Sequence, residues 1–361
     1  MRAGARPPMR VAYVVDTSAF GGAEVYLQQL LRASRGVVEP SLLAARPGVA
    51  ALENGARALG VPVESFSRID RKLDVGRLYA LARAISRRRP DLVHVNMTTA
   101  TNNRYAIAAA LLARVPTVAT VHSPVAVGTP RHTFFLRGLF ARLRAVIAVS
   151  RAVHKVVVED LRVPPAHVHL IANGVADAEP LSTPPGSRAR IVALGRLERE
   201  KGFDVLIAAT RMLAERAIPV EVVICGEGRE RRALEEASRD LPVTLPGFVA
   251  DAAQRWQGAH VFCLPSRLEG LPLSLLEAMT RALPCVASDV GDVGEALGAA
   301  GKTVPPDDPR ALADAIASVV ADPDRAAAMG AAARARALAH HSVDAMIERT
   351  IDLYAACLHG C

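Results

Sequence analysis

The sequence lacks the cysteine and histidine spacings that hold metal ions or build a disulfide framework. Its five cysteines are an odd number, and none of them forms a CxxC pair or stands beside a histidine at metal-ligand spacing. Three of the five lie inside the apolar runs VEVVIC, HVFCL and PCVAS and are predicted to be small core residues. We therefore expect a protein of a reducing compartment that has no metal site.

Long apolar runs are also missing. No run in the 361 residues approaches the roughly 20 apolar residues that cross a bilayer. The charged start MRAGARPPMR is not followed by the apolar stretch of a secretory signal. With 51% hydrophobic and 22% charged residues, the composition is that of a soluble globular protein, and the length favours two domains. These features predict a cytoplasmic protein.

Acidic residues are absent from one long stretch. Between Asp91 and Glu159 there is no carboxylate side chain, and the first 180 residues hold 24 lysines and arginines against 12 acidic residues. The N-terminal half is therefore expected to meet an anionic partner. A basic nucleic-acid-binding protein is one alternative. It is disfavoured because aromatic residues make up only 4% of the chain and do not alternate with basic ones in a stacking platform.

Buried-strand patterns alternate with helical patterns along the chain, which is typical of parallel sheets built from βαβ units. The strand candidates RVAYVV, DLVHV, TVATV and AVIAV belong to the first half, and RIVAL, VEVVIC, HVFCL and PCVAS to the second. Between them the stretch ADAEPLSTPPGSRAR is rich in proline, glycine and serine and is the expected linker. The predicted fold class is α/β, with doubly wound domains at 9–179 and 190–341, a linker at 180–189 and a last helix at 342–361.

Two cations, Arg196 and Lys201, follow the strand candidate RIVAL and precede a helical pattern, in the segment GRLEREKGFDVLI. In this position they would lie beside the amino end of a helix, whose free amides also point at anions. The segment therefore predicts a phosphate-binding clamp. A solvated run of charge is the alternative, because Glu198, Arg199 and Glu200 lie between the two cations.

Two carboxylates, Glu269 and Glu277, stand eight positions apart in PSRLEGLPLSLLEAM, after the strand candidate HVFCL. The amides around Gly270, Leu271 and Leu273 would form the anion-binding start of a helix. Carboxylates repel phosphate but accept hydrogen bonds from hydroxyls, so a ligand with both groups, such as a nucleotide sugar, would satisfy the cations and the acids together. The alternatives are a core arginine as the partner of Glu277 and an exposed loop position for Glu269.

These motifs stand in an order that resembles the family 4 retaining glycosyltransferases of the GT-B fold, also called glycosyl transferases group 1. The segments GRLEREKG, GEGRERRALE, LPGFV and PSRLEGLPLSLLEAM look like the successive motifs of that family's C-terminal half. GGAEVYLQQL resembles its N-terminal glycine loop, and TVATVHS, AVIAVS and IANGV follow in the family's order. The resemblance implies two Rossmann-like domains facing each other across a cleft, with the last helix returning to the N-terminal domain.

By this resemblance, the C-terminal domain would bind the donor. Arg196 and Lys201 would hold its diphosphate, and Glu277 the ribose hydroxyls. Glu269 would bind hydroxyls of the transferred sugar, assisted by the amides of Gly270, Leu271 and Leu273.

The resemblance also assigns residues of the N-terminal domain. Gly22 lies in the loop that would approach the phosphates, and His122 would contact the sugar near the reacting centre. From spacing alone, His122 would instead be a core histidine. Two positions depart from the family pattern, namely Ser123, where an acid is common, and Asp292, where a second glycine is common. Ser123 leaves acceptor recognition open.

The segment RHTFFLRGLFARLRAV predicts a helix with one apolar face. That face is expected to dock on the sheet, while the flanking cations would touch anionic lipid or a lipid-linked acceptor near the mouth of the cleft. The cations assigned to this acceptor and membrane side are Arg131, Arg137, Arg142 and Arg144.

The sequence as a whole predicts a hexosyltransferase that acts with retention on a UDP- or GDP-sugar, without metal or cofactor. Its acceptor would be a glycan or a lipid-linked molecule of envelope or surface polysaccharide assembly, and the enzyme could work at the inner face of the membrane. A nucleotide-sugar epimerase or hydrolase on the same fold is the alternative enzyme.

Overall fold

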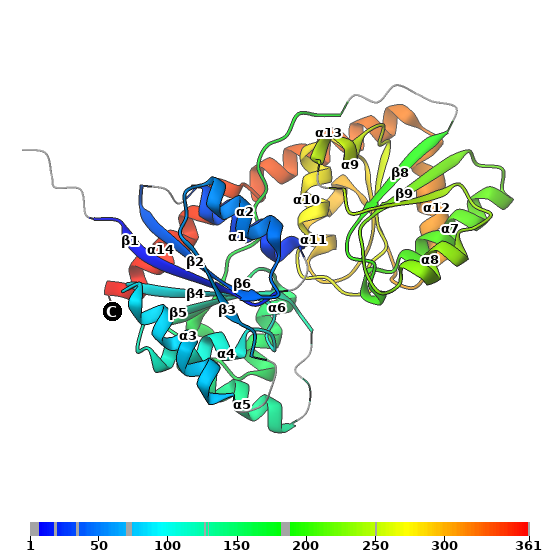
Figure 1. Ribbon diagram of the computed structural model, residues 1–361. Coiled ribbons are helices and arrows are strands. Elements are labelled where there is room, and N and C mark those ends of the chain that lie inside the picture. The colour runs from blue at the N-terminus through cyan, green and yellow to red at the C-terminus, as the bar shows by residue number, and fades with distance from the viewer. Residues whose placement is uncertain are drawn as a thin grey trace, which may run out of the picture. The chain divides into compact units, whose positions relative to one another are not determined.

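The computed structural model describes residues 7–17, 20–33, 36–69, 74–125, 128, 130–181, 188–249 and 251–359. Contacts divide the chain into two compact units, both visible in Figure 1. The N-terminal unit comprises Met1–Asn173 together with Val343–Cys361, and the C-terminal unit comprises Gly174–Ser342.

A sheet of parallel strands forms the centre of the N-terminal unit. Its order is β3-β2-β1-β4-β5-β6-β7. The strands are β1 Met9–Val15, β2 Val38–Arg46, β3 Val63–Ser67, β4 Leu92–Thr99, β5 Thr117–Ser123, β6 Ala145–Ala148 and β7 Val168–Leu170. The central strands are buried on both faces, which explains why they appear in the sequence as continuous apolar runs rather than as an alternation.

Helices cover both faces of this sheet (Figure 1). One face carries α1 Gly22–Ala33, α2 Ala50–Ala58 and α14 Val343–His359, and the other carries α3 Val75–Arg87, α4 Arg104–Leu112 and α5 Pro130–Phe140. After β6 come α6 Arg151–Lys155, a π-helical turn at Val156–Asp160 and a 3-10 turn at Pro165–His167. No helix among the described residues is long and apolar enough to cross a membrane.

The last helix, α14, belongs to the N-terminal unit although its sequence follows the C-terminal one. It packs beside α1 and buries Met346, Ile347 and Leu353. The hydroxyl of Tyr354, which is fully buried, forms a hydrogen bond with Nδ1 of His94 on β4. The helix is therefore tied to the sheet by a buried polar contact as well as by apolar packing.

The C-terminal unit contains a second parallel sheet, in the order β10-β9-β8-β11-β12-β13. Its strands are β8 Ala189–Leu194, β9 Val220–Cys225, β10 Val243–Gly247, β11 Val261–Leu264, β12 Cys285–Ser288 and β13 Lys302–Val304. On one face lie α7 Phe203–Glu215, α8 Arg231–Ala237 and α12 Pro309–Val320 (Figure 1). On the other lie α9 Ala252–Trp256, α10 Leu273–Thr280, α11 Val293–Leu297 and α13 Pro323–His340. Short 3-10 turns stand at Arg199–Lys201 and Gly298–Ala300.

The units divide after Asn173, earlier in the chain than the expected boundary after residue 179. The amide of Val175 donates to the carbonyl of His341 at 2.8 Å, and Asp177 forms an ion pair with Arg334 at 2.7 Å. These contacts attach the segment 174–179 to the C-terminal unit. Of the expected linker at 180–189, residues 182–187 lie outside the described part of the chain.

Strand order reverses once in each sheet, between β1 and β4 and between β8 and β11. The loops that follow the two strands at such a point diverge to opposite faces and leave a crevice at the carboxyl edge, where open α/β sheets bind ligands. In the C-terminal unit, the loops after β8 and β11 carry Arg196, Lys201 and Glu269. We therefore expect the ligand-binding site of the C-terminal unit at this carboxyl edge of the sheet.

We expect Tyr354→Phe to destabilise the N-terminal unit by about 1–3 kcal/mol, because it leaves Nδ1 of the buried His94 ring without its partner. Urea unfolding followed by circular dichroism measures the change. The matched control is Tyr79→Phe, since Tyr79 is exposed on α3 and its loss of a hydroxyl should leave the midpoint unchanged. Equal midpoints for the two variants would mean that the Tyr354–His94 bond adds nothing to stability.

Candidate functional site

The loop after β8 contains a tight turn that packs against a neighbouring loop. Residues Arg199–Lys201 form a 3-10 turn that ends at Gly202, whose φ of +63° places it in the left-handed region. A Cβ at Gly202 would lie 2.0 Å from the carbonyl oxygen of Pro265, so this position requires glycine. Close approach of the two backbones brings the loop after β8 against the loop after β11.

The two loops meet in an ion pair between Lys201 and Glu269. The Nζ atom of Lys201 lies 2.7 Å from Oε1 of Glu269, and the hydroxyl of Ser266 donates to the same oxygen at 2.7 Å. The Lys201 side chain is 18% exposed and that of Glu269 only 8%. Glu269 is therefore not the exposed loop acid that the sequence left open. A partly buried pair of this kind needs additional hydrogen bonds, and Ser266 supplies one.

Arg196 lies in the same loop but has another partner. Its guanidinium forms an ion pair with Glu200 at 2.8 Å, and both side chains are more than a third exposed. Such a pair contributes little to stability and can exchange partners at small cost. Lys201 and Glu269 are thus in direct contact. Arg196 belongs to the same loop as Lys201 but is paired with Glu200.

Arg267 ties the two loops together, and sequence reasoning did not single it out. Its amide donates to the carbonyl of Glu200 at 2.8 Å, and its guanidinium bonds Asp204 at 2.7 and 2.8 Å and Asp307 at 2.6 Å. These hydrogen bonds raise the pKa of Arg267 and lower that of Asp204. Arg267 stands between Ser266 and Glu269 in the segment PSRLEG, so the sequence placed it near the candidate site. Its role could not be predicted, because Asp204 and Asp307 are distant in the chain.

The start of α10 offers backbone donors beside the ion pair. Within the described residues, the amides of Gly270 and Leu273 donate to no protein acceptor. The segment at Gly291 crosses directly over this point, with the Asp292 amide donating to the carbonyl of Gly270 at 3.0 Å. A Cβ at Gly291 would lie 2.2 Å from the carbonyl oxygen of Glu269. Glycine is therefore needed at position 291. Asp292, which stands where the family pattern commonly has a second glycine, does not prevent this close contact between the two backbones.

Glu277 projects from the middle of α10 toward Arg255, a partly exposed arginine, whereas the alternative partner expected from the sequence was an unspecified core arginine. Their nearest atoms are 3.9 Å apart, which is beyond hydrogen-bond distance. Burial raises the pKa of Glu277, and the charges of Arg255 and Arg281 oppose that rise. Among the described residues no group donates a hydrogen bond to its carboxylate. Arg255 thus balances the charge of Glu277 and leaves its acceptor positions open.

The N-terminal unit places His122 at the carboxyl end of β5, next to β4. Its ring is half-buried, with Nε2 lying 2.8 Å from Oδ1 of Asn96 and the ring of Tyr26 meeting it edge-on at 4.8 Å between centroids. Burial lowers the pKa of His122 to about 3, so the imidazole is neutral at ordinary pH. Gly22, also a predicted site residue, is exposed as the first residue of α1. Ser123 is the last residue of β5.

The arginines assigned to the acceptor side do not share one edge of the sheet. Helix α5 runs back from the end of β5 to the start of β6, so the chain reaches the amino edge after it. Arg142 and Arg144 precede β6 and therefore lie at the amino edge, opposite the edge that carries His122. Arg137 lies within α5 and donates to the carbonyl of Asp160 at 2.9 Å. The side chain of Arg131 lies outside the described residues.

All four arginines are expected from the sequence to lie together near the mouth of the cleft, but Arg142 and Arg144 lie at the edge of the N-terminal sheet opposite the edge that carries His122. A helix of eleven residues spans roughly 16 Å, about the width of the sheet along its strands, so cations at its two ends cannot share an edge. The apolar face of α5 docks on the sheet as expected, burying Leu136 and Phe140, while Phe134 is left exposed.

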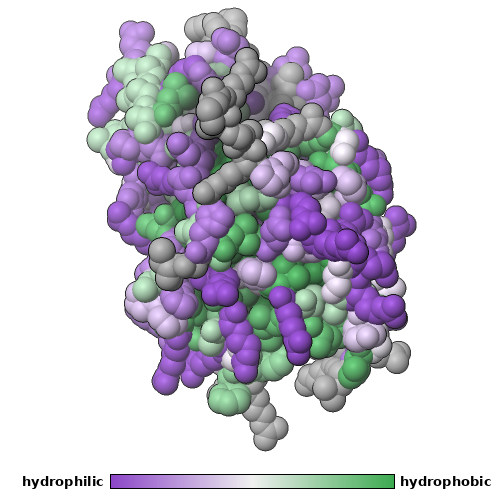
Figure 2. Space-filling model, turned by 90° about the vertical axis from the view of Figure 1, so that its left-hand side faces the viewer, coloured by the Kyte–Doolittle hydropathy of each residue, from purple (hydrophilic) through white to green (hydrophobic). Residues whose placement is uncertain are grey.

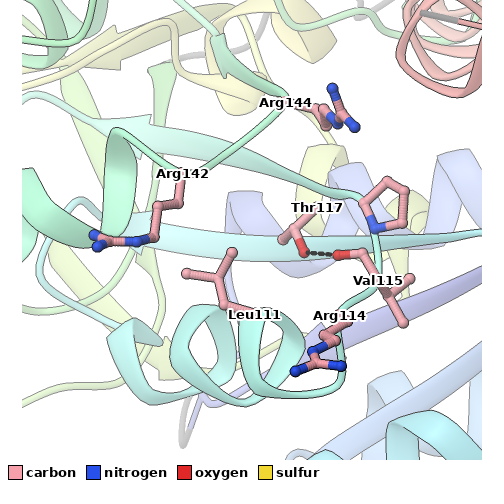
Figure 3. A pocket seen from close by; sticks show the side chains of 7 residues that line it. Leu111, Arg114, Val115, Thr117, Arg142 and Arg144 are labelled. Carbon is pink, nitrogen blue, oxygen red and sulfur yellow. Dashed lines mark hydrogen bonds between the residues drawn. The ribbon is translucent and has the colours of Figure 1, made fainter.

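Arg142 and Arg144 line an open pocket together with Arg114, at the amino ends of β5 and β6 (Figure 3). The three guanidinium groups spread around the pocket rather than converging on one point. None of them forms an ion pair with a residue of the described chain. Figure 2 shows the side of the molecule toward the start of β1, where hydrophilic side chains surround small groups of hydrophobic ones.

Two protein-family profiles match the chain over most of its length. Residues 20–179 match the family described as "Glycosyltransferase Family 4", and residues 188–322 match "Glycosyl transferases group 1". Among curated proteins, the chain is 30% identical to glycogen synthase of Mycobacterium tuberculosis (strain ATCC 25618 / H37Rv) over 295 residues, covering 75% of this chain and 70% of that one. It is 31% identical to alpha-maltose-1-phosphate synthase of Mycolicibacterium smegmatis over 244 residues, covering 58% and 62%.

Solved structures share the fold across both units. The structure of Anabaena Alr3699/HepE in complex with UDP-glucose matches with a TM-score of 0.83 at 20% identity, covering 96% of this chain and 100% of that one. Sucrose-phosphate synthase from Thermosynechococcus elongatus matches with a TM-score of 0.79 at 20% identity, covering 97% and 99%.

We expect Gly202→Ala to destabilise the C-terminal unit by about 1–3 kcal/mol, because it combines a positive φ with a backbone clash at Pro265. The separation of the two loops should also break the Lys201–Glu269 pair. Thermal unfolding checks the first effect. The control is Gly76→Ala in α3, where the nearest atom to the new Cβ lies 3.9 Å away and stability should be unchanged or slightly raised. A Gly202→Ala variant as stable as the control would contradict the described loop geometry.

Proposed function

The chain belongs to the family 4 glycosyltransferases of the GT-B fold, and we propose that it transfers a hexosyl group from a nucleotide sugar to an acceptor with retention of anomeric configuration. The observation that carries the proposal is the Lys201–Glu269 pair at the strand-order reversal between β8 and β11. In this pair, a cation that suits phosphate lies in direct contact with a carboxylate that suits sugar hydroxyls.

Donor binding would work by exchange of partners. A diphosphate carries more negative charge than a carboxylate, so it competes for Lys201 and for Arg196, whose bond to Glu200 is exposed. Glu269 is then released to accept hydrogen bonds from hydroxyls of the sugar, while Ser266 keeps it oriented. The cations and the helix-start amides of Gly270, Leu271 and Leu273 neutralise the leaving diphosphate, and no metal or other cofactor is required.

Glu277 would bind the ribose of the same donor. Its carboxylate has Arg255 as a counter-charge and keeps open acceptor positions, which is the state that two neighbouring hydroxyls need. In the N-terminal unit, His122 and Gly22 stand at the carboxyl edge of the sheet, the edge at which such folds bind their ligands. We assign His122 to a hydroxyl of the transferred sugar and Gly22 to the approach to the phosphates.

The donor we propose is a UDP- or GDP-sugar. Three of the similar structures contain UDP, UDP and glucose, or UDP-glucose. A relative that is 34% identical over 168 residues is named GDP-mannose-dependent alpha-(1-6)-phosphatidylinositol monomannoside mannosyltransferase. Its name also supports a lipid-linked or saccharide acceptor, and hence a role in envelope or surface glycan synthesis at the inner face of the membrane. A nucleotide-sugar epimerase or hydrolase would need no acceptor and is the alternative.

The proposal predicts that one UDP-, GDP- or ADP-sugar raises the melting temperature of the wild-type chain by mass action. With an acceptor, that donor should be consumed to glycoside rather than to epimer or free sugar. Lys201→Ala should reduce transfer about 100-fold or more, because it removes a charge that stabilises the leaving diphosphate. Arg196→Ala should act in the same direction.

Arg199→Ala is the matched control, since Arg199 lies in the same turn and its side chain is exposed. It should keep both donor binding and transfer. Transfer should also persist in EDTA. Wild-type rates in Lys201→Ala would remove the clamp from the mechanism, a strict need for Mn²⁺ would overturn metal-free catalysis, and free sugar as the sole product would favour the hydrolase.

We also propose that the amino edge of the N-terminal sheet meets an anionic membrane. Arg114, Arg142 and Arg144 are exposed there without carboxylate partners in the described chain, and Leu112 adds an exposed apolar side chain beside them. Each arginine near an anionic bilayer contributes about 1 kcal/mol to binding. The spread of the three guanidinium groups suits many separate headgroups better than one small anion.

Replacing all three by glutamine should therefore weaken binding to vesicles of anionic lipid by up to about 100-fold, and salt should weaken the wild-type chain likewise. Sedimentation with vesicles measures both. The comparison variant, Arg131→Gln with Arg137→Gln, removes the cations of α5 instead. If only this double variant lost binding, the membrane contact would lie along α5 and not at the amino edge of the sheet. Binding that ignores lipid charge would refute the contact altogether.

A further inference from the structure

A chain of hydrogen bonds runs beneath His122 in the N-terminal unit. Nε2 of the ring lies 2.8 Å from Oδ1 of Asn96, and Nδ2 of Asn96 donates to the carbonyl of Ala23 at 2.9 Å. Asn96 is 1% exposed and sits on β4, while Ala23 belongs to the first turn of α1. The side chain of Asn103 donates to the main-chain oxygen of Asn96 at 2.5 Å and holds that strand end in place.

The partner at Ala23 determines which way the Asn96 amide faces. A carbonyl oxygen only accepts hydrogen bonds, so the NH₂ group of Asn96 must face Ala23. Its oxygen then faces His122 and can only accept. The ring nitrogen opposite it must therefore carry the proton.

The tautomer of His122 follows from this orientation. A neutral imidazole has one protonated nitrogen and one nitrogen with a free lone pair. With the proton on Nε2, the lone pair is on Nδ1. Among the described residues no group bonds Nδ1, and this atom is not enclosed. Nδ1 can thus accept a hydrogen bond from a ligand.

We infer that Asn96 is a positioning residue, which fixes His122 with its proton on Nε2 so that Nδ1 accepts a hydrogen bond from a hydroxyl of the transferred sugar. The inference rests on the proposed function for the identity of that hydroxyl. The orientation of the ring and its tautomer are properties of the free protein.

The surroundings keep the ring neutral. Burial lowers the pKa of His122, and the titratable groups packed near it are the buried His94 on β4 and Tyr26 on α1. The pKa of Tyr26 is raised by burial, so neither neighbour supplies a negative charge that would hold a proton on Nδ1. His122 therefore serves as an acceptor across the working pH range and does not supply a proton.

The test reads the tautomer directly in the full chain labelled with ¹⁵N-histidine. Long-range ¹H–¹⁵N spectra should show His122 with a protonated Nε2 and an unprotonated Nδ1. In Asn96→Ala this single pattern should give way to a mixture, and kcat for transfer should fall about 10–100-fold, the range found when the partner that orients a metal-binding histidine is lost. The donor KM should change less, because Asn96 does not touch the donor.

Asn96→Asp gives a second measurement that does not depend on the alanine variant folding well. It gives up the bond to Ala23 but keeps an oxygen opposite Nε2, and its negative charge should raise the pKa of His122 by about one unit or more. The acidic limb of the rate profile should move to higher pH with it. His94, which bonds Thr120 and Tyr354, is the internal reference and should keep its spectrum.

Asn102→Ala is the matched control, since Asn102 is an exposed asparagine between β4 and α4 whose side chain accepts a hydrogen bond from Thr99 and has no other partner in the described part of the chain. It should leave the His122 spectrum and kcat unchanged. A proton on Nδ1 in the wild-type chain would overturn the inference, as would an Asn96→Ala variant with an unaltered tautomer and kcat. A correct tautomer in a wild-type chain that transfers from no nucleotide sugar would refute the sugar hydroxyl and the proposed function, while positioning by Asn96 would stand.

Discussion

The reversal of strand order between β8 and β11 is the constraint on which the candidate site depends. It sends the loops after these strands over one edge of the sheet, and Gly202 lets their backbones meet at Pro265. The Lys201–Glu269 pair and the hydrogen bond from the Arg267 guanidinium to the carbonyl of Arg199 lie across this meeting point. Arg267 also bonds Asp204 in α7 and Asp307 after β13. These contacts hold the two loops in register, so the groups that we propose for phosphate and for hydroxyls lie close together in the free protein.

A different kind of polar network organises the N-terminal unit. His94, Asn96 and Thr120 are buried under α1 and α14, where unpaired polar groups would be costly, and each has a hydrogen-bond partner from another element. Through Tyr354 this network fixes the last helix, and through Asn96 it fixes His122. Two neighbouring groups of buried hydrogen bonds on β4 therefore hold the closing segment of the fold and His122, respectively.

The arginines of the acid-free stretch show where a linear pattern misleads. Arg131, Arg137, Arg142 and Arg144 are close in sequence, and this closeness predicted a single patch near the site. Because α5 runs antiparallel to the strands it covers, its two ends lie at opposite edges of the sheet. Sequence distance along a helix does not reveal which edge is reached, since that depends on where the next strand begins.

The sequence by itself determined the fold class and the family, and it proposed most residues of the candidate site, because apolar strand runs and glycine-bounded turns are local features. It could not reveal Ser266, Arg267 or Asn96, whose roles come from partners that folding brings together. It also left open whether Glu277 meets an arginine or a ligand. Only the tertiary structure decided that Arg255 stands 3.9 Å away, near enough to balance the charge and too far to occupy the carboxylate.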